Sequence, residues 1–199
     1  TLCFIALFCN TAIHAQAWQT QDPNFLYKTT PYNVICPNAT DAWTFGFEVD
    51  SATQYYTEVN YTLSRTTNSG ETWESITFPH TEPGYFSCLS ASSGDVAWIS
   101  YVDYSEGNKL LQTVDGGLTW TQLPVYLGVW INLAHLFDEN KGVTMGDPDS
   151  LGFEIHTTLD GGASWTRVDN NNIPAALPDE YAFAGSYEVV GSEIWFETT

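Results

Sequence analysis

The sequence predicts an all-β fold made of repeated four-stranded antiparallel sheets. The main observation is a phrase that recurs three times, at residues 66–73 (TTNSGETW), 113–120 (TVDGGLTW) and 158–165 (TLDGGASW). Its tryptophans are 47 and then 45 positions apart, a period typical of propeller blades and other stacked arrays. The second observation is the composition, which is 43% apolar and 15% aromatic and therefore suits a core of buried strands.

Each copy of the phrase lies between two alternating, strand-like segments and is therefore predicted to form a hairpin turn. Asn or Asp followed by glycine supplies the positive φ angles that tight turns require, and the Asx side chain accepts hydrogen bonds from N–H groups of the same turn. The tryptophan that ends the phrase has a large apolar face that fits between successive sheets. We expect structural roles for these positions of the phrase: Asn68, Gly70, Trp73, Asp115, Gly117, Trp120, Asp160, Gly162 and Trp165.

Two further strand-like stretches precede each turn, and four meandering strands per repeat make the blade of a β-propeller. The stretches are 32–36 and 42–47, then 85–89 and 96–102, then 129–137 and 142–145. We expect a propeller fragment of about three blades plus the start of a fourth. The blades are placed at about 31–79, 84–125 and 129–169, and the fourth begins at 181–199, where EIWFETT matches the second strands AWTFG and VAWIS.

The N-terminus is predicted to be part of an export signal. Residues 1–17 combine a short apolar run with Ala15 and Ala17, the small residues that a signal peptidase requires. The run is too short to cross a bilayer of roughly 30 Å, and we expect no membrane span. The mature protein is therefore expected to be soluble and to be secreted, at the cell surface, or periplasmic in a bacterium.

Residues 18–30 are predicted to close the ring. They begin with WQTQ, which resembles WTQL at 120–123, the strand that follows the second turn, although no turn phrase precedes them. Propellers commonly let their first strand complete the last blade, because this hides edges that would pair with other chains. We therefore expect Trp18 to lie in the outer strand of the last blade.

Charge and cysteine content limit the class of partner. Five Lys plus Arg against 24 Asp plus Glu give a formal charge of −19, which repels nucleic acid and anionic lipid surfaces. Once the signal is removed, Cys36 and Cys88 remain, each in the strand that opens a repeat. They either form a disulfide in an oxidising compartment or pack as separate core thiols.

The repeated phrase resembles the Asp-box, or BNR repeat, which has the pattern Ser/Thr-x-Asp-x-Gly-x-Thr/Ser-Trp. In the first copy, Asn68 stands in place of the Asp. Asp-box propellers include sialidases and the photosystem II assembly-factor-like proteins. The spacing and the MGDP at 145–148 look most like the latter group and its exported bacterial relatives. The resemblance covers residues 31–199 and implies that the phrase lies at the propeller periphery and is structural. Many exported relatives end in a sorting domain for type IX secretion, and any such domain would lie past residue 199.

Tests for catalysis give no assignment. A sialidase grips its substrate carboxylate with three arginines, whereas this sequence has two, Arg65 and Arg167. Another glycosidase needs two carboxylates roughly 5 to 10 Å apart. Asp147 and Asp149 lie in a predicted loop after an inner strand, where a propeller places functional groups, although a solvated loop is the more frequent explanation for such residues. The histidines and cysteines do not have metal-site spacing, and we expect neither a metal nor a cofactor.

Aromatic residues on loops are the remaining candidates for binding. Tyr55 and Tyr56 lie in the insertion that lengthens the first repeat, and Tyr101 and Tyr104 occupy the matching loop of the second. Such side chains stack on sugar rings, anchor a protein partner, or pack on the blade edge.

Three classes of function remain. The preferred one is an exported, non-catalytic scaffold or recognition module for a protein or a glycan. The alternatives are a glycoside hydrolase, sialidase-like or other, with catalytic residues in further blades, and an assembly factor for a membrane complex.

Overall fold

The computed structural model describes residues 20–25, 29–49, 56–77, 84–125, 130–191 and 193–199, with the side chains of 49 and 56–60 excepted. The predicted signal peptide, Trp18 and Tyr55 lie outside these residues. The chain divides into two compact units, Thr1–Phe78 and Pro79–Thr199. No helix among the described residues is long and apolar enough to cross a membrane.

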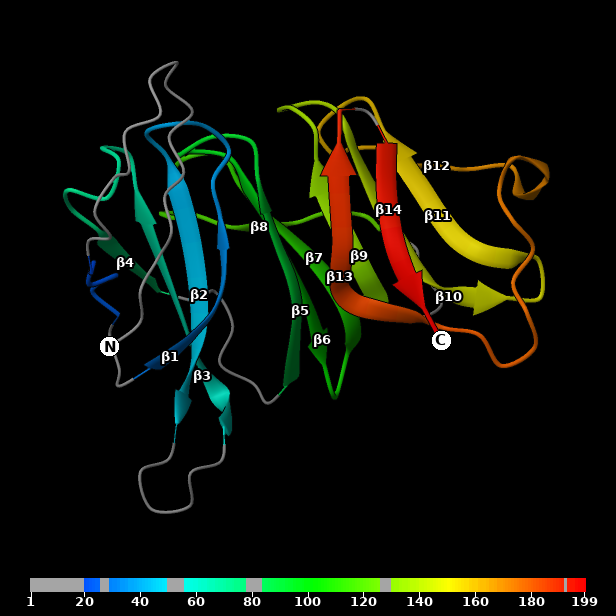
Figure 1. Cartoon of the computed structure of the whole chain (residues 1–199), viewed down its shortest axis with the longest axis horizontal. Helices are drawn as coiled ribbons and strands as arrows, with labels where there is room; N and C mark the ends of the chain where they lie inside the picture. Colours follow the sequence, from blue (N-terminus) through cyan, green and yellow to red (C-terminus); the bar gives the residue numbers. More distant parts are fainter. Residues whose placement is uncertain (1–19, 26–28, 50–55, 78–83, 126–129, 192) are drawn as a thin grey trace. The chain divides into compact units, whose positions relative to one another are not determined.

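The first unit contains one four-stranded antiparallel sheet in the order β1-β2-β3-β4 (Figure 1). Trp43, Phe45 and Leu63 are buried in it, and the rings of Tyr32 and Phe47 lie 5.1 Å apart at its surface. The aromatic residues favour strands because their flat side chains pack across the pleat. The strands are β1 (Thr29–Ile35), β2 (Ala42–Val49), β3 (Tyr56–Thr66) and β4 (Glu74–Thr77).

The second unit contains two more four-stranded antiparallel sheets and a two-stranded one (Figure 1). The prediction of an all-β fold with three four-stranded sheets and the start of a fourth is confirmed. One 3-10 turn, η1 (Asn170–Asn172), interrupts the connection to the last sheet. The sheets are β5 (Gly84–Ala91), β6 (Ala97–Asp103), β7 (Gly107–Thr113) and β8 (Thr121–Gln122); β9 (Ile131–Leu136), β10 (Gly142–Asp149), β11 (Gly152–Thr158) and β12 (Thr166–Arg167); and β13 (Ala182–Val190) and β14 (Glu193–Thr198).

Successive sheets of the second unit pack face to face. Trp98 of β6 is fully buried among residues of its own sheet and of β9, and its ring lies 5.4 Å from that of Trp165. Gly142 of β10 allows this contact, because a Cβ built there would overlap the indole of Trp98. The next boundary is aromatic as well, since Phe153 of β11 lies 5.6 Å from Phe196 of β14. Apolar burial between sheets is therefore the main source of stability.

Candidate functional site

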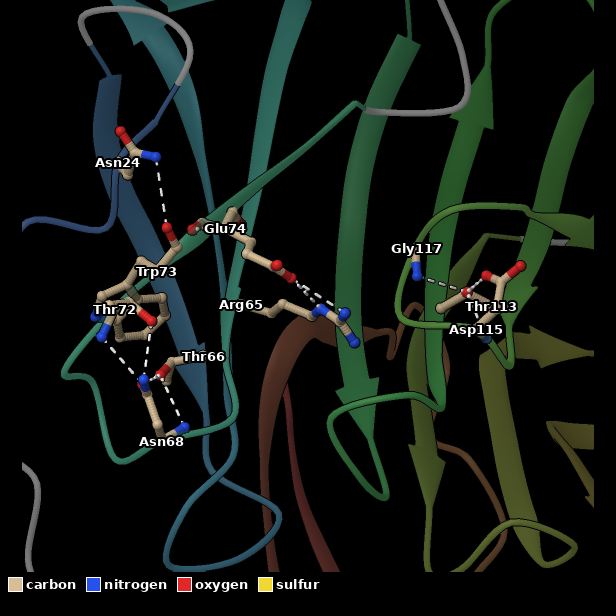
Figure 2. Close-up of polar contacts among 11 residues, drawn as sticks. Asn24, Arg65, Thr66, Asn68, Thr72, Trp73, Glu74, Thr113, Asp115 and Gly117 are labelled. Atoms are coloured by element: carbon tan, nitrogen blue, oxygen red, sulfur yellow. Dashed lines mark hydrogen bonds and ion pairs between the residues drawn. The ribbon is translucent and has the colours of Figure 1, made fainter.

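The three copies of the repeated phrase form closely similar hairpin turns. Figure 2 shows the first two of them. In the second turn, the Thr113 hydroxyl donates to Asp115 Oδ1 (2.9 Å) and accepts from the Gly117 N–H (2.8 Å). Asp115 accepts from the Thr119 N–H (2.9 Å) and from the Thr119 hydroxyl (2.6 Å). The Asp115 carboxylate is therefore engaged by hydrogen bonds within its own turn.

Each turn is also tied to the loop between the first two strands of its sheet. Gly116 N donates to the carbonyl of Asp95 (2.9 Å), and Gly161 N donates to that of Asn140 (2.8 Å). In the first turn the same position is Ser69, whose N–H donates to Thr40 (2.8 Å) although its φ is +60°. Glycine adopts this left-handed conformation without steric cost, and this accounts for Gly-Gly in the other two turns.

The aspartates of the second and third turns, Asp115 and Asp160, have pKa values below the usual range. Hydrogen bonds from the Thr119 hydroxyl, and then from its N–H, lower the pKa of Asp115 to about 2. Those from Ser164 lower the pKa of Asp160 to about 2 as well. The first turn has Asn68, whose amide donates to Thr72 Oγ1 (2.9 Å) and accepts from the Thr72 N–H (3.0 Å), so this position has no carboxylate to protonate.

We expect the double substitution Asp115→Asn and Asp160→Asn to make the chain less sensitive to acid. A folded-state pKa below the unfolded value gives stability that is complete above about pH 4 and is lost as the pH falls from about 4 to about 2. The amide at Asn68 holds its turn without this dependence. The melting temperature, measured from pH 7 to pH 2, should therefore fall less steeply in the double variant than in the wild type.

The opposite change provides the control for this prediction. Asn68→Asp should add acid sensitivity, because its turn would then require a charged carboxylate. If the melting temperature fell equally steeply with pH in all three proteins, the assignment of acid sensitivity to these turns would be contradicted.

Aromatic side chains gather at the opposite end of the second unit from its turns. Residue Gly84, at the start of β5, pairs with Asp103 beside the β6–β7 hairpin, and Ile131, at the start of β9, pairs with Gly146 near the β10–β11 hairpin. The rings of Tyr85 and Trp130 lie 5.8 Å apart there, and Trp130 is 46% exposed. We call this end the hairpin end. The sequence prediction assigned Trp130 to a strand and missed this pair, although an aromatic residue directly before an inner strand was visible in it.

The two aspartates predicted as binding candidates are both engaged. Asp147 Oδ1 accepts from the Asn132 amide (2.6 Å) and from the N–H of Ala182 at the start of β13 (3.3 Å), so it joins two sheets. Asp149 forms a two-pronged ion pair with Arg167 (2.8 and 2.9 Å). The guanidinium, followed by the Leu151 N–H, lowers the pKa of Asp149 to about 2.

The predicted tyrosines divide. Tyr104 is 55% exposed in the β6–β7 hairpin, within the hairpin end. Tyr101 is 1% exposed, and its placement in a loop was wrong, because β6 continues to Asp103 and the hairpin spans only 104–106. Tyr56 begins β3, where its side chain is not described, and Tyr55 lies outside the described residues.

The remaining ionisable groups show how the charges are used. Asp103 is almost fully buried and pairs with Lys109 (3.2 Å), and the Ser105 hydroxyl and neighbouring donors hold its pKa well below the usual range. The described residues contain no cluster of three or more His, Cys, Asp or Glu that could hold a metal ion. Cys36 and Cys88 are both free thiols, and burial raises the pKa of Cys88 to about 11.

The fold and the repeated turns define a β-propeller-like protein. Among solved structures, the chain is similar to YCF48 bound to a D1 peptide, with 19% identity, a TM-score of 0.52, and coverage of 90% of this chain and 57% of that one. It is also similar to YCF48 from Cyanidioschyzon merolae (19% identity, TM-score 0.49, 73% of this chain and 38% of that one). A third similar structure is the GH74 xyloglucanase from Xanthomonas campestris (12% identity, TM-score 0.45, 65% of this chain and 19% of that one).

All three structures share 19% sequence identity or less with this chain. The similarity to YCF48 bound to a D1 peptide therefore supports the β-propeller-like fold and nothing further. The chain spans 57% of the length of that structure. No protein-family model and no curated protein matches the sequence.

Proposed function

We propose that this chain is a non-catalytic recognition module that binds a protein segment at the hairpin end of its second unit. The observation that carries the proposal is the pair Tyr85 and Trp130, which presents a half-exposed indole at the start of two adjacent inner strands. Tryptophan and tyrosine are the residues that most often dominate binding energy at interfaces, because they bury a large area at a small entropic cost. Exposed Tyr104 extends the same end.

The charge distribution favours a basic partner. The sequence carries a net charge of −19. All four cationic side chains among the described residues pair with carboxylates of their own sheet: Arg65, Lys109, Lys141 and Arg167. The uncompensated carboxylates therefore create a negative field that attracts a cationic segment to the protein and repels an acidic one.

The engagement of the candidate carboxylates supports binding in preference to hydrolysis. Asp147 holds Asn132 and the start of β13, and Asp149 holds Arg167. A glycosidase needs one carboxylic acid with a raised pKa opposite a second carboxylate, whereas the pKa of Asp149 is lowered. The similar structure of YCF48 has a D1 peptide bound to it, which is in keeping with this proposal.

Two further assignments belong to the proposal. We infer that the repeated turn is an Asp-box, from the three matching hydrogen-bond networks, and that the protein is exported, from the apolar residues 1–17. A glycan is the second candidate ligand, because an exposed indole also stacks on sugar rings.

The substitution Trp130→Ala tests the proposed function. We expect the wild-type chain to bind immobilised 15-residue peptides of net charge about +4 that contain Phe or Leu, and to ignore peptides of equal length and charge about −4. Trp130→Ala should raise the dissociation constant roughly tenfold, since loss of an interface tryptophan typically costs more than about 1 kcal/mol.

The matched control is Leu177→Ala, which removes an apolar side chain that is 67% exposed on the connection to β13. It should leave peptide binding unchanged. Binding of a glycan array but of no peptide would support the second candidate, and equal losses in both variants would contradict the assignment of the site to Trp130.

A further inference from the structure

Asp147 lies at the hairpin end, directly beyond the last residue pair that joins β9 and β10. That pair is Ile131 and Gly146, so Trp130 and Asp147 are the next residues of the two antiparallel strands. The half-exposed indole and the carboxylate therefore stand at the same level of the sheet. Asp147 is partly exposed, whereas Gly146 before it is buried.

Two β-bulges turn the side chains at this place. Asn132 is the extra residue where β9 pairs with β10, and Asp147 is the extra residue where β10 pairs with β11. A bulge takes its extra residue out of the regular alternation and re-aims the side chain. The Asn132 amide, which belongs to a residue only 5% exposed, donates to Asp147 Oδ1 (2.6 Å), and the N–H of Ala182 donates to the same oxygen (3.3 Å). These two bonds fix the orientation of the carboxylate.

The second carboxylate oxygen of Asp147, Oδ2, accepts no hydrogen bond from the described residues. None of the four cationic side chains in that part of the chain pairs with Asp147 either. The neighbouring carboxylates differ in this respect. Glu106 pairs with Lys109 (2.6 Å), and Asp149 holds Arg167 with both of its oxygens. Asp147 therefore presents an uncompensated negative charge through one oriented oxygen.

The connection that leads into β13 adds to the negative charge at this end. Asp179 is exposed and Glu180 is partly exposed, and both lie just before Ala182, the residue whose N–H contacts Asp147. A cationic group placed at Asp147 is therefore favoured by several carboxylates, of which Asp147 offers the direct contact.

We propose that Asp147 binds a basic side chain of the peptide whose apolar residue packs on Trp130, and that it sets the preference of the site for a positively charged ligand. This inference rests on the proposed function and adds the residue that selects the charge. The start of β9 is flanked by β5, which supplies Tyr85, and by β13, which supplies the N–H of Ala182. A bound segment therefore crosses β9 from the aromatic pair to the carboxylate.

The single available oxygen also limits the kind of basic side chain that gains from this contact. Asp147 cannot grip a guanidinium in the two-pronged manner seen between Asp149 and Arg167, because its Oδ1 is already engaged. An ammonium group is a compact charge that one oxygen can hold, whereas the advantage of arginine depends on two oxygens. We therefore expect peptides with lysine or arginine at this place to bind with affinities within about threefold of each other.

Asp147→Asn tests the inference with little change in shape. The amide oxygen of asparagine can still accept the bonds from Asn132 and Ala182, so the substitution removes mainly the charge. The probes are a basic, Phe-containing peptide that the wild-type chain binds, and versions of it in which one lysine at a time is acetylated, which removes the positive charge. In the wild type, acetylation of one lysine near the Phe should weaken binding roughly fivefold. In Asp147→Asn, the same acetylation should change the affinity by less than about twofold.

Glu139→Gln is the matched control for net charge. Its side chain is exposed in the β9–β10 loop, at the other end of the same sheet, and its replacement removes the same single charge. This variant should keep the roughly fivefold preference for the unmodified lysine. Trp130→Ala should instead weaken the unmodified and acetylated peptides by similar factors, because it removes the apolar contact and leaves the carboxylate in place.

Salt concentration provides a second readout. Raising it from about 0.05 M to about 0.5 M screens a partly exposed charge pair, so the wild-type preference for the unmodified lysine should shrink several-fold, with little change in Asp147→Asn.

The possible outcomes separate this inference from the proposed function. Binding that depends on Trp130 but keeps the same lysine preference in Asp147→Asn overturns the inference and leaves the proposed function standing. Equal losses of both peptides in Asp147→Asn would show that Asp147 only positions β13, which overturns the inference as well. If no peptide binds the wild-type chain, the proposed function fails and the inference fails with it.

Discussion

Trp98→Ala should lower the free energy of unfolding of the second unit by about 3–5 kcal/mol. The side chain is fully buried between two sheets and lies against Trp165, Leu136 and the backbone of Gly142. Its removal loses the transfer free energy of the indole and leaves a cavity that two rigid sheets cannot fill. Denaturant unfolding, followed by far-ultraviolet circular dichroism, measures the change.

Trp130→Ala is the matched control for this prediction. It removes the same side chain from a position that is 46% exposed, so the loss should stay below about 1 kcal/mol. Similar losses in the two variants would contradict the assignment of the core to the boundary between the sheets.

Gly142→Ala should be the second most damaging change, with a cost of about 1–3 kcal/mol from a single added methyl group. A Cβ at this position would overlap the indole of Trp98 and would lie 3.0 Å from the carbonyl oxygen of His135. The φ angle of Gly142 is not in the left-handed region, so the expected cost comes from packing and not from the backbone.

A double-mutant cycle separates this cause from others. In a Trp98→Leu background the indole is absent, so Gly142→Ala should cost at least about 1 kcal/mol less than it does in the wild type. Additive effects would show that the methyl group clashes with the backbone of β9 and not with Trp98.

The local structure was predictable because it depends on residues close together in the chain. Thr113, Asp115 and Gly117 lie within one turn, and their pattern specifies the hydrogen bonds among them. Tyr101 shows the limit of this reasoning, since the length of β6 depends on its pairing with β7, which continues to Asp103 opposite Gly107. The predicted stretch 96–102 already contained Tyr101, so its separate assignment to a loop was wrong, and the ring is buried in β6.

The candidate sites were less predictable because they depend on partners far away in the chain. Asp147 is fixed by Asn132 and by Ala182, which lie 15 and 35 positions from it. Trp130 meets Tyr85 only because β5 and β9 are adjacent strands of different sheets. A short sequence pattern cannot indicate partners that lie so far apart in the chain. The sequence prediction therefore named Asp147 as a binding candidate and did not name Trp130.

The repeated sequence determined the all-β architecture, the four-strand unit and the hydrogen bonds within the turns. These features depend on residues that lie only a few positions apart in the chain. Packing in three dimensions decided that Trp98 is buried against the following sheet and that Asp147 holds Asn132 and the start of β13. Solvent exposure depends on what lies across the boundary from a sheet, and that information is carried by other parts of the chain.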